Sequence, residues 1–370
     1  MNMSPVGLKR VSTVPRLIAF YLPQFHPVPE NDEWWGKGFT EWTNVTRAKP
    51  LYKGHIQPNL PGELGFYDLR VSEVREEQAR LARNHGIEGF CYWHYWFGNG
   101  KKILERPFDE VRNSGRPDYP FCLGWANESW SGIWHGLQNK ILIEQTYPGI
   151  EDYRMHFREL ESAFHDTRQL CVDGKPIFVV YLPERLPNAR EFTDTWNEMA
   201  VRSGFSGIYF IGIFEDLSVK PQDYGFNGKS GHFPGSALGV GRSPPRHRFR
   251  RKVPQPTIFD YAEYVVNAEN LFSSIDDFIP CVVPNWDNTP RSDHRGIVLA
   301  GATIELYKRQ LTSAIEAVSD RPSEEQIVLL KSWNEWAEGN YLEPDQLNGR
   351  RLLEATLEVV NMVSGEVKDA

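Results

Sequence analysis

Short, continuously apolar runs alternate with longer amphipathic segments along almost the whole of this 370-residue chain. A strand without a polar face is typical of a parallel sheet that is covered by helices on both sides. This alternation constrains the fold more than any other feature of the sequence. The apolar runs are Leu17–Leu22, Gly89–Trp93, Phe121–Ala126, Ile177–Leu182, Ile208–Phe214, Ile279–Val283 and Ile327–Trp333.

The segments between these runs have the spacing of amphipathic helices. In Val71–His85, apolar residues such as Val74, Leu81 and Ala82 recur with charged residues between them. Strands that alternate with such segments indicate an α/β fold. The other helical patterns are Glu151–Leu170, Ala189–Ser203, Tyr261–Ser274, Ala302–Val318 and Arg351–Val363.

An eighth strand would complete a barrel, and the long interval between Phe214 and Ile279 is the place for it. Tyr224–Phe233 is a weak candidate because it is rich in glycine. With this strand the chain fits a (β/α)8 TIM barrel with long βα loops, and without it an open doubly wound sheet remains possible. No GxGxxG motif follows the first strand, so the open alternative lacks its usual dinucleotide signal. We predict the barrel, as a single catalytic domain over residues 16–365 that follows an N-terminal extension at 1–15.

Composition argues against several classes of function. The net charge is -8 and the pI is ≈ 5.8, so the chain lacks the overall basic excess that would predict nucleic-acid binding. No apolar run is long enough to span a bilayer and no signal peptide is visible, so we expect no transmembrane segment and a cytoplasmic location. Many of the 12 tryptophans stand beside glycine or asparagine, which predicts a binding cleft as well as a core.

Metal and nucleophile motifs are missing from the sequence. The histidines show neither HxH nor HExxH spacing, and no GxSxG motif provides a serine nucleophile. The cysteines form no CxxC pair and three of them lie in apolar runs, so we expect buried free thiols. We therefore predict no metal and no cofactor. The cysteines are Cys91, Cys122, Cys171 and Cys281.

Polar and aromatic residues gather directly after the predicted strands. In a barrel, the carboxyl ends of all strands meet at one rim, so residues far apart in sequence converge there. Carboxylates that lie close together beside tryptophan raise the pKa of at least one of them, which keeps an acid protonated near neutral pH. The segments concerned are 92–96, 125–130, 181–184, 215–216, 285–288 and 334–338.

Glu335 and Glu338 are the first candidates for a catalytic pair. They follow the apolar run Ile327–Leu330, lie between tryptophans, and are three residues apart, which predicts side chains roughly 5–6 Å from each other. Cleavage of a glycosidic bond needs an acid, a second carboxylate and aromatic faces for the sugar. Glu128, in an Asn-Glu sequence at another strand end, is an alternative partner for Glu335.

The remaining rim residues are expected to hold the sugar. For each of them a place in the core is the competing interpretation, above all for the tryptophans and for His94. The predicted contacts are Tyr21, His26, His94, Tyr95, Trp125, Asn127, Glu128, Trp130, Trp286, Asp287, Asn334 and Trp336. The expected partner is therefore a polysaccharide or oligosaccharide.

The segment 242–256 is strongly basic in a chain that is acidic overall. It holds five arginines, one lysine and four prolines in fifteen residues. A solvated surface loop is the simpler interpretation, and a contact for an anionic glycan or phospholipid head group is the alternative.

Seven motifs occur together in one order between Leu17 and Pro344. They read AFYLPQFHP, WWGKGFTEW, PNLPGELGFYDL, GIEGFCYWHYWFG, FCLGWANESW, PNWDNTPR and SWNEWAEGNYLEP. In these motifs the chain resembles the WbsX-like family, which is related to the family-99 glycoside hydrolases, the endo-α-mannosidase group. The resemblance implies a (β/α)8 barrel that acts on α-linked glycans.

The resemblance also implies roles for the two glutamates of NEWAEG. Glu338 matches the general acid/base, and Glu335 matches the residue that deprotonates the sugar 2-hydroxyl, so that a 1,2-anhydro sugar forms and the configuration is retained. The WbsX-like group is often labelled glycosyltransferase and tied to O-antigen or capsule loci. The sequence holds no metal-binding DxD motif, which a transferase that uses a nucleotide sugar usually needs. We therefore expect a retaining, endo-acting hydrolase of a microbial surface polysaccharide. A glycosyltransferase and a non-catalytic glycan-binding barrel are the alternatives.

Overall fold

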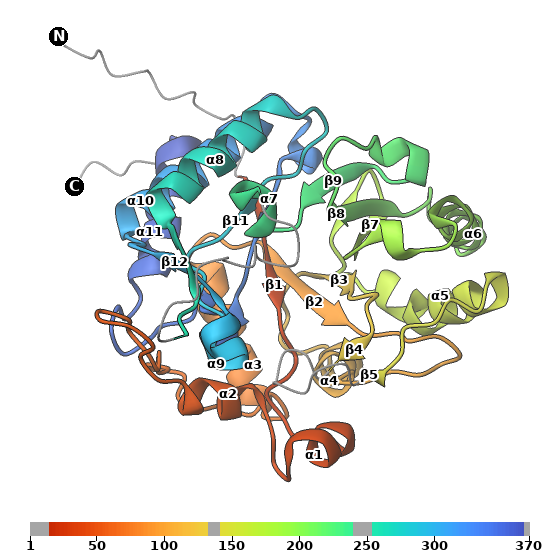
Figure 1. Ribbon diagram of the computed structural model, residues 1–370. Coiled ribbons are helices and arrows are strands. Elements are labelled where there is room, and N and C mark those ends of the chain that lie inside the picture. Colours follow the sequence, from red (N-terminus) through yellow and green to blue (C-terminus); the bar gives the residue numbers. More distant parts are fainter. Residues whose placement is uncertain (1–14, 132–140, 240–253, 366–370) are drawn as a thin grey trace.

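Eight parallel strands form a nearly closed barrel in the computed structural model (Figure 1), which describes residues 15–131, 141–239 and 254–365. A single parallel bridge between Lys229 and Phe278 joins the two ends of the sheet, and the Ile279 amide donates to the Lys229 carbonyl over 2.7 Å. The predicted (β/α)8 barrel is confirmed. In sheet order the strands are β11 (Cys281–Val282), β13 (Ile327–Leu330), β1 (Arg16–Tyr21), β2 (Gly89–His94), β3 (Phe121–Trp125), β7 (Lys175–Val180), β8 (Tyr209–Phe214) and β9 (Gly228–Gly231).

The weak eighth strand is confirmed as β9, and the structure explains its glycines. A Cβ atom on Gly228 would lie 2.8 Å from Ile279 Cδ1, and one on Gly231 would lie 2.8 Å from Ser236 Oγ. Glycine lets the strand approach these neighbours closely without displacing their side chains. The tight packing that closes the barrel is thus the reason why the sequence signal is poor.

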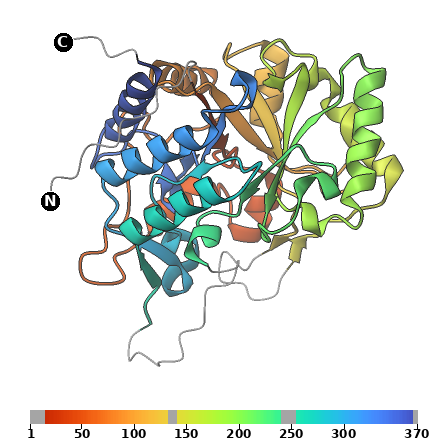
Figure 2. The same ribbon diagram turned by 90° about the horizontal axis from the view of Figure 1, so that it is seen from above.

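Helices cover the outside of the barrel (Figure 2). The six predicted helical segments are confirmed, but α5 ends at Phe164 rather than Leu170. The Asp166 side chain accepts the Arg168 amide over 2.9 Å, and this turn directs the chain into β6 (Cys171–Val172). The main helices are α3 (Ser72–Asn84), α4 (Arg106–Ser114), α5 (Ile150–Phe164), α6 (Ala189–Arg202), α8 (Tyr261–Ser274), α10 (Ile304–Val318) and α11 (Arg351–Ser364).

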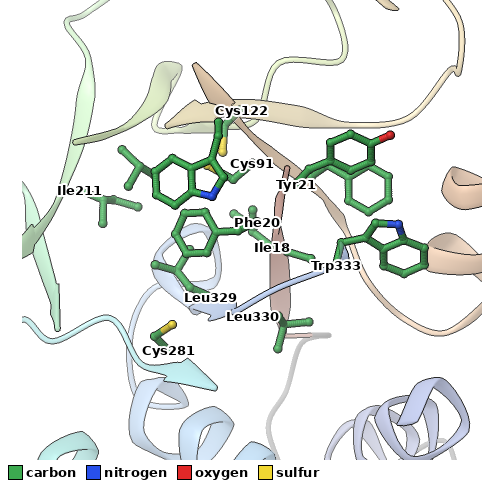
Figure 3. Packing of buried hydrophobic residues seen from close by; sticks show 14 of the residues in the cluster. Ile18, Phe20, Tyr21, Cys91, Cys122, Ile211, Cys281, Leu329, Leu330 and Trp333 are labelled. Carbon is green, nitrogen blue, oxygen red and sulfur yellow. The ribbon is translucent and has the colours of Figure 1, made fainter. Parts of the chain in front are cut away.

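The two faces of β1 show where the core lies (Figure 3). Phe20 points into the barrel and stacks on Trp93 with ring centroids 4.7 Å apart. Its neighbour Tyr21 points to the helix layer, where its hydroxyl donates to Gln78 of α3 over 2.7 Å. This alternation follows from the period of two in a strand. The four cysteines are free thiols, as predicted.

The long βα loops carry short elements of their own on the carboxyl-end rim (Figure 1). They are α1 (Pro29–Trp35), α2 (Glu41–Arg47), α7 (Gly235–Leu238), α9 (Thr289–Ser292), the parallel pair β10 (Thr257–Asp260) and β12 (Ile297–Ala300), and the hairpins β4 (Trp130–Ser131) with β5 (Ile141–Ile143) and β14 (Asn334–Glu335) with β15 (Asn340–Tyr341). No helix within the described ranges is long and apolar enough to cross a membrane. Residues 1–14 of the predicted extension and 242–253 of the basic segment lie outside the described residues.

Candidate active site

The segment that follows β13 is fastened to the end of β1. The Trp333 amide donates to the Phe20 carbonyl over 2.8 Å. The Asn334 side chain then accepts the Leu22 amide over 2.7 Å and donates to the Leu22 carbonyl over 3.1 Å. These contacts place Glu335 at the mouth of the barrel. They also occupy the whole Asn334 amide, so Asn334 positions the segment rather than facing a sugar.

Glu335 and Glu338 lie side by side, as their spacing predicts. Glu335 is 6% exposed, and a hydrogen bond joins the two carboxyl groups. The Trp93 indole N–H, from β2, donates to Glu335 Oε1 over 3.1 Å. The 3-10 turn Trp336–Glu338 sets the position of the second carboxyl group.

Gly339 ends this turn in a left-handed conformation, with φ at 66°. The Asp287 amide donates to the Glu338 carbonyl over 2.8 Å, and a Cβ atom on Gly339 would lie 2.7 Å from that same Asp287 nitrogen. Since the obstacle is backbone, it cannot move aside cheaply. Glycine is therefore required for the turn that carries Glu338.

We expect Gly339→Ala to lower the free energy of unfolding by about 1–3 kcal/mol, because it adds a clash to an unfavourable φ. Chemical denaturation measures this loss. Gly301→Ala is the matched control, since Gly301 also has a positive φ of 81° but open space around its Cα. Equal costs for the two substitutions would contradict the requirement for close approach.

Two positively charged side chains lie beside the Glu335–Glu338 carboxyl pair. Arg291, from α9, donates through Nη1 to Glu338 Oε1 over 2.6 Å and through Nη2 to Glu41 Oε1 over 2.6 Å. Lys331, directly after β13, interacts electrostatically with both Glu335 and Glu338, and its ammonium group lies 5.2 Å from the centre of the Trp286 ring. The site thus combines three carboxyl groups with two positive charges.

The two glutamates have opposite pKa shifts. Burial, together with the neighbouring Glu338 carboxylate, raises the pKa of Glu335 to about 8. Burial also opposes ionisation of Glu338, but the charges of Arg291 and Lys331 outweigh it and lower the pKa of that carboxyl. At neutral pH the pair therefore holds one proton, which rests on Glu335 in the absence of substrate.

These shifts predict how stability depends on pH. A folded-state pKa above the unfolded value makes the folded protein bind more protons, so its stability falls as the pH rises from about 5 to about 8. Glu335 contributes to this loss, and so does Glu343, whose pKa burial raises to about 7. Urea titrations across this range should show the decline, and Glu335→Gln should flatten it. An equal decline in the variant would contradict the assignment of the proton to Glu335.

Aromatic rings surround the carboxyl pair. Burial and the Glu335 charge raise the pKa of Tyr95 well above its usual range, which places its hydroxyl near the pair. Tyr95 also packs on Trp130, with ring centroids 5.1 Å apart. On the other side, Tyr181 packs on Trp93 and exchanges a hydrogen bond of 2.6 Å with His232. Among the predicted contacts, Tyr95 and Trp286 thus lie near the carboxyl pair, and Trp130 adjoins Tyr95.

Four other predicted contacts lie in the core. Tyr21 faces α3, as described above. His94 shares a hydrogen bond of 2.9 Å with His156, and Trp125 is 1% exposed and donates to the Trp96 carbonyl over 2.9 Å. Asn127 accepts the Leu182 amide over 3.0 Å and donates to the Leu182 carbonyl over 2.9 Å, so it ties together two loops. Their burial and these hydrogen bonds favour a structural role for all four.

The remaining predicted contacts support the rim. Trp336 is 1% exposed, donates to Glu343 over 2.6 Å and stacks on Tyr341. The Asp287 carboxylate accepts hydrogen bonds from His55, Gln57 and Thr289. His26 is buried against the Pro23 carbonyl. Glu128 is partly buried on the loop between β3 and β4.

The sequence interpretation missed three charged members of the candidate site, Glu41, Arg291 and Lys331. It also did not single out the aromatic residue Trp93. Glu41 and Arg291 stand in the motifs WWGKGFTEW and PNWDNTPR, so both were inside segments already noted. Lys331 is a charged residue at the end of an apolar run. Its place at a strand end was the available signal.

The described residues hold no group of three or more His, Cys, Asp or Glu side chains arranged to bind a metal ion. A cavity of about 730 Å³ adjoins Gly339, but neither Glu335 nor Glu338 lines it. Its wall includes Asp287 and Gly339, together with Asn285 and Asn348.

Residues 17–356 match the family described as glycosyltransferase WbsX. The chain belongs to the WbsX family. A curated relative from Xanthomonas campestris pv. campestris (strain B100), the uncharacterized protein WxcX, is 37% identical over 345 residues. This match covers 92% of our WbsX-family chain but only 49% of the relative, so the chain spans about half the length of the curated relatives it matches.

Solved structures support the same barrel. A GH99 endo-alpha-mannosidase from Bacteroides thetaiotaomicron aligns with a TM-score of 0.62 at 16% identity, over 95% of this chain and 97% of that one. A glycoside hydrolase-like protein aligns with a TM-score of 0.59 at 15% identity, over 96% and 97%. At such low identity these likenesses establish that this WbsX-family chain has the same fold.

Proposed function

We propose that this protein is a retaining, endo-acting glycoside hydrolase that cleaves an α-linked glycan of a microbial surface polysaccharide. One observation carries the proposal. Glu335 and Glu338 form a buried, hydrogen-bonded pair at the mouth of the barrel, and their pKa values are shifted in opposite directions. An acid and a base side by side, edged by Trp93 and Tyr95, are the groups that glycoside cleavage requires.

Direct contact between the two carboxyl groups favours one version of this chemistry. A protein nucleophile and its acid flank the bond and stand about 5–5.5 Å apart. The hydrogen bond between Glu335 and Glu338 brings their carboxyl groups closer together than this separation. This fits the route that the resemblance to the family-99 enzymes implies, in which the sugar's own 2-oxygen displaces the leaving oxygen.

In this reaction Glu335 takes the 2-hydroxyl proton while Glu338 protonates the leaving oxygen, which gives a 1,2-anhydro sugar. The resting proton lies on Glu335, so it first crosses the hydrogen bond to Glu338 as substrate binds. Water then attacks the anomeric carbon. Glu338 accepts the proton of that water and Glu335 returns one to the 2-oxygen, so the configuration is retained. As the product leaves, the proton crosses back from Glu338 to Glu335, which restores the resting state.

A glycosyltransferase remains the second candidate because the family description names that activity. Product analysis separates the two. We expect incubation with O-antigen and capsule polymers to give shorter chains with new reducing ends by mass spectrometry. Elongated chains that form only when a nucleotide sugar is added would establish the transferase instead. Binding of a glycan without turnover of any polymer would indicate a binding barrel.

A further inference from the structure

We propose that Arg291 is a positioning residue that holds Glu338 as the ionised member of the carboxyl pair, and that Glu41 anchors Arg291 from behind. This inference deepens the proposed function, because it names the group that decides where the proton of the pair resides. Glu41 and Arg291 come from different loops, and neither belongs to the catalytic segment.

The geometry of the arginine fork supports this role. Its two terminal nitrogens each donate to a different carboxylate, one to Glu338 and one to Glu41, both over 2.6 Å. The Arg291 side chain is 15% exposed, Glu338 13% and Glu41 1%, so solvent screens these contacts little. A planar guanidinium can make both contacts at once, whereas the single ammonium of lysine has no such fork.

Glu41 is built to hold the arginine rather than the substrate. Its Oε1 also accepts the Ala337 amide over 3.1 Å, so the same oxygen fastens the catalytic turn. Its Oε2 is buried and has no hydrogen-bond partner among the described side chains and backbone. A carboxyl group buried in this way depends on Arg291 for its charge.

The charges of the site balance only if one carboxyl group is protonated. Arg291 and Lys331 supply two positive charges against three carboxyl groups. Arg291 donates hydrogen bonds to Glu338 and Glu41, whereas it acts on Glu335 only through its charge, so the proton falls to Glu335. The groups that face Glu338 are Arg291 of α9, Lys331 after β13, Glu335 of β14, Asn340 of β15, Glu41 of α2 and Tyr95 after β2.

A titration without substrate tests this inference. The full chain is labelled with carbon-13 at the glutamate side-chain carboxyl, and the signal of Glu338 is assigned by its loss in Glu338→Gln. We expect Glu338 to titrate at a higher pH in Arg291→Gln than in the wild type, with Arg291→Lys between the two. Arg295→Gln is the matched control, since Arg295 is exposed in the adjoining turn, and it should change nothing.

Glu41→Gln makes the opposite change in charge near Glu338. It removes a negative charge near Glu338, while the glutamine oxygen can still accept from Arg291 and hold it in place, so Glu338 should titrate at the same or a lower pH than in the wild type. If Arg291→Gln fails to fold, Arg291→Lys and Glu41→Gln still decide the question through these opposite shifts. An unchanged Glu338 titration in the Arg291 variants, or an upward shift in Glu41→Gln, would overturn the inference. Because no polymer is used, the outcome is independent of whether hydrolysis is ever observed.

Discussion

Glu335→Gln and Glu338→Gln are each expected to lower the rate of polymer cleavage by about 10³-fold or more while the fold stays intact. Glutamine keeps the size of the side chain but can neither give nor take the proton. Since the two carboxyl groups act together in one step of the proposed reaction, the double substitution should cost little more than either single one. Initial rates of new reducing-end formation measure the loss, and circular dichroism verifies the fold.

Glu354→Gln is the control for these variants, because Glu354 is exposed on α11 and lies outside the proposed site. It should leave the rate unchanged. A rate near that of the wild type in either catalytic variant would remove Glu335 and Glu338 from the mechanism.

Glu343→Leu is expected to destabilise the fold by about 3 kcal/mol or more. The Glu343 side chain is 1% exposed and accepts hydrogen bonds from Trp336, Gln78 and Tyr67 over 2.6 to 2.8 Å. Leucine leaves these three buried donors without their acceptor. Because Trp336 lies between Glu335 and Glu338, the loss should also disturb the turn Trp336–Glu338.

Glu198→Leu is the matched control for Glu343. Glu198 is exposed on α6 and pairs only at the surface with Arg202, an interaction that contributes about 0–1 kcal/mol. The free energy of unfolding of both variants is measured by urea denaturation. Similar losses at the two positions would show that the Glu343 hydrogen bonds contribute little.

Periodicity and strand-end position were enough to predict most of the fold. Continuous apolar runs identified the strands, and only β9 was weak, because glycine is needed where the barrel closes. The six longest helices were found, but the nine-residue α4 was not predicted. The end of α5 depends on the local turn at Asp166, which the apolar pattern does not report.

The site was predicted in part. The close placement of Glu335 and Glu338 follows from their spacing, whereas the contacts of Arg291 depend on how two distant loops fold together. Tyr21 shows an avoidable error: a period of two places it on the opposite face of β1 from Phe20, toward α3. For Trp125, the pattern could not distinguish a sugar platform from a side chain that closes the core.

The stereochemistry of the first product tests the central claim most directly. Proton NMR follows the anomeric signal during early cleavage of a polymer that the protein degrades, before mutarotation mixes the anomers. The account predicts that an α-linked glycan first yields the α-anomer at the new reducing end, and that Glu338→Gln yields none. An initial β-anomer, or cleavage that persists in Glu338→Gln, would contradict a retaining reaction carried out by this pair.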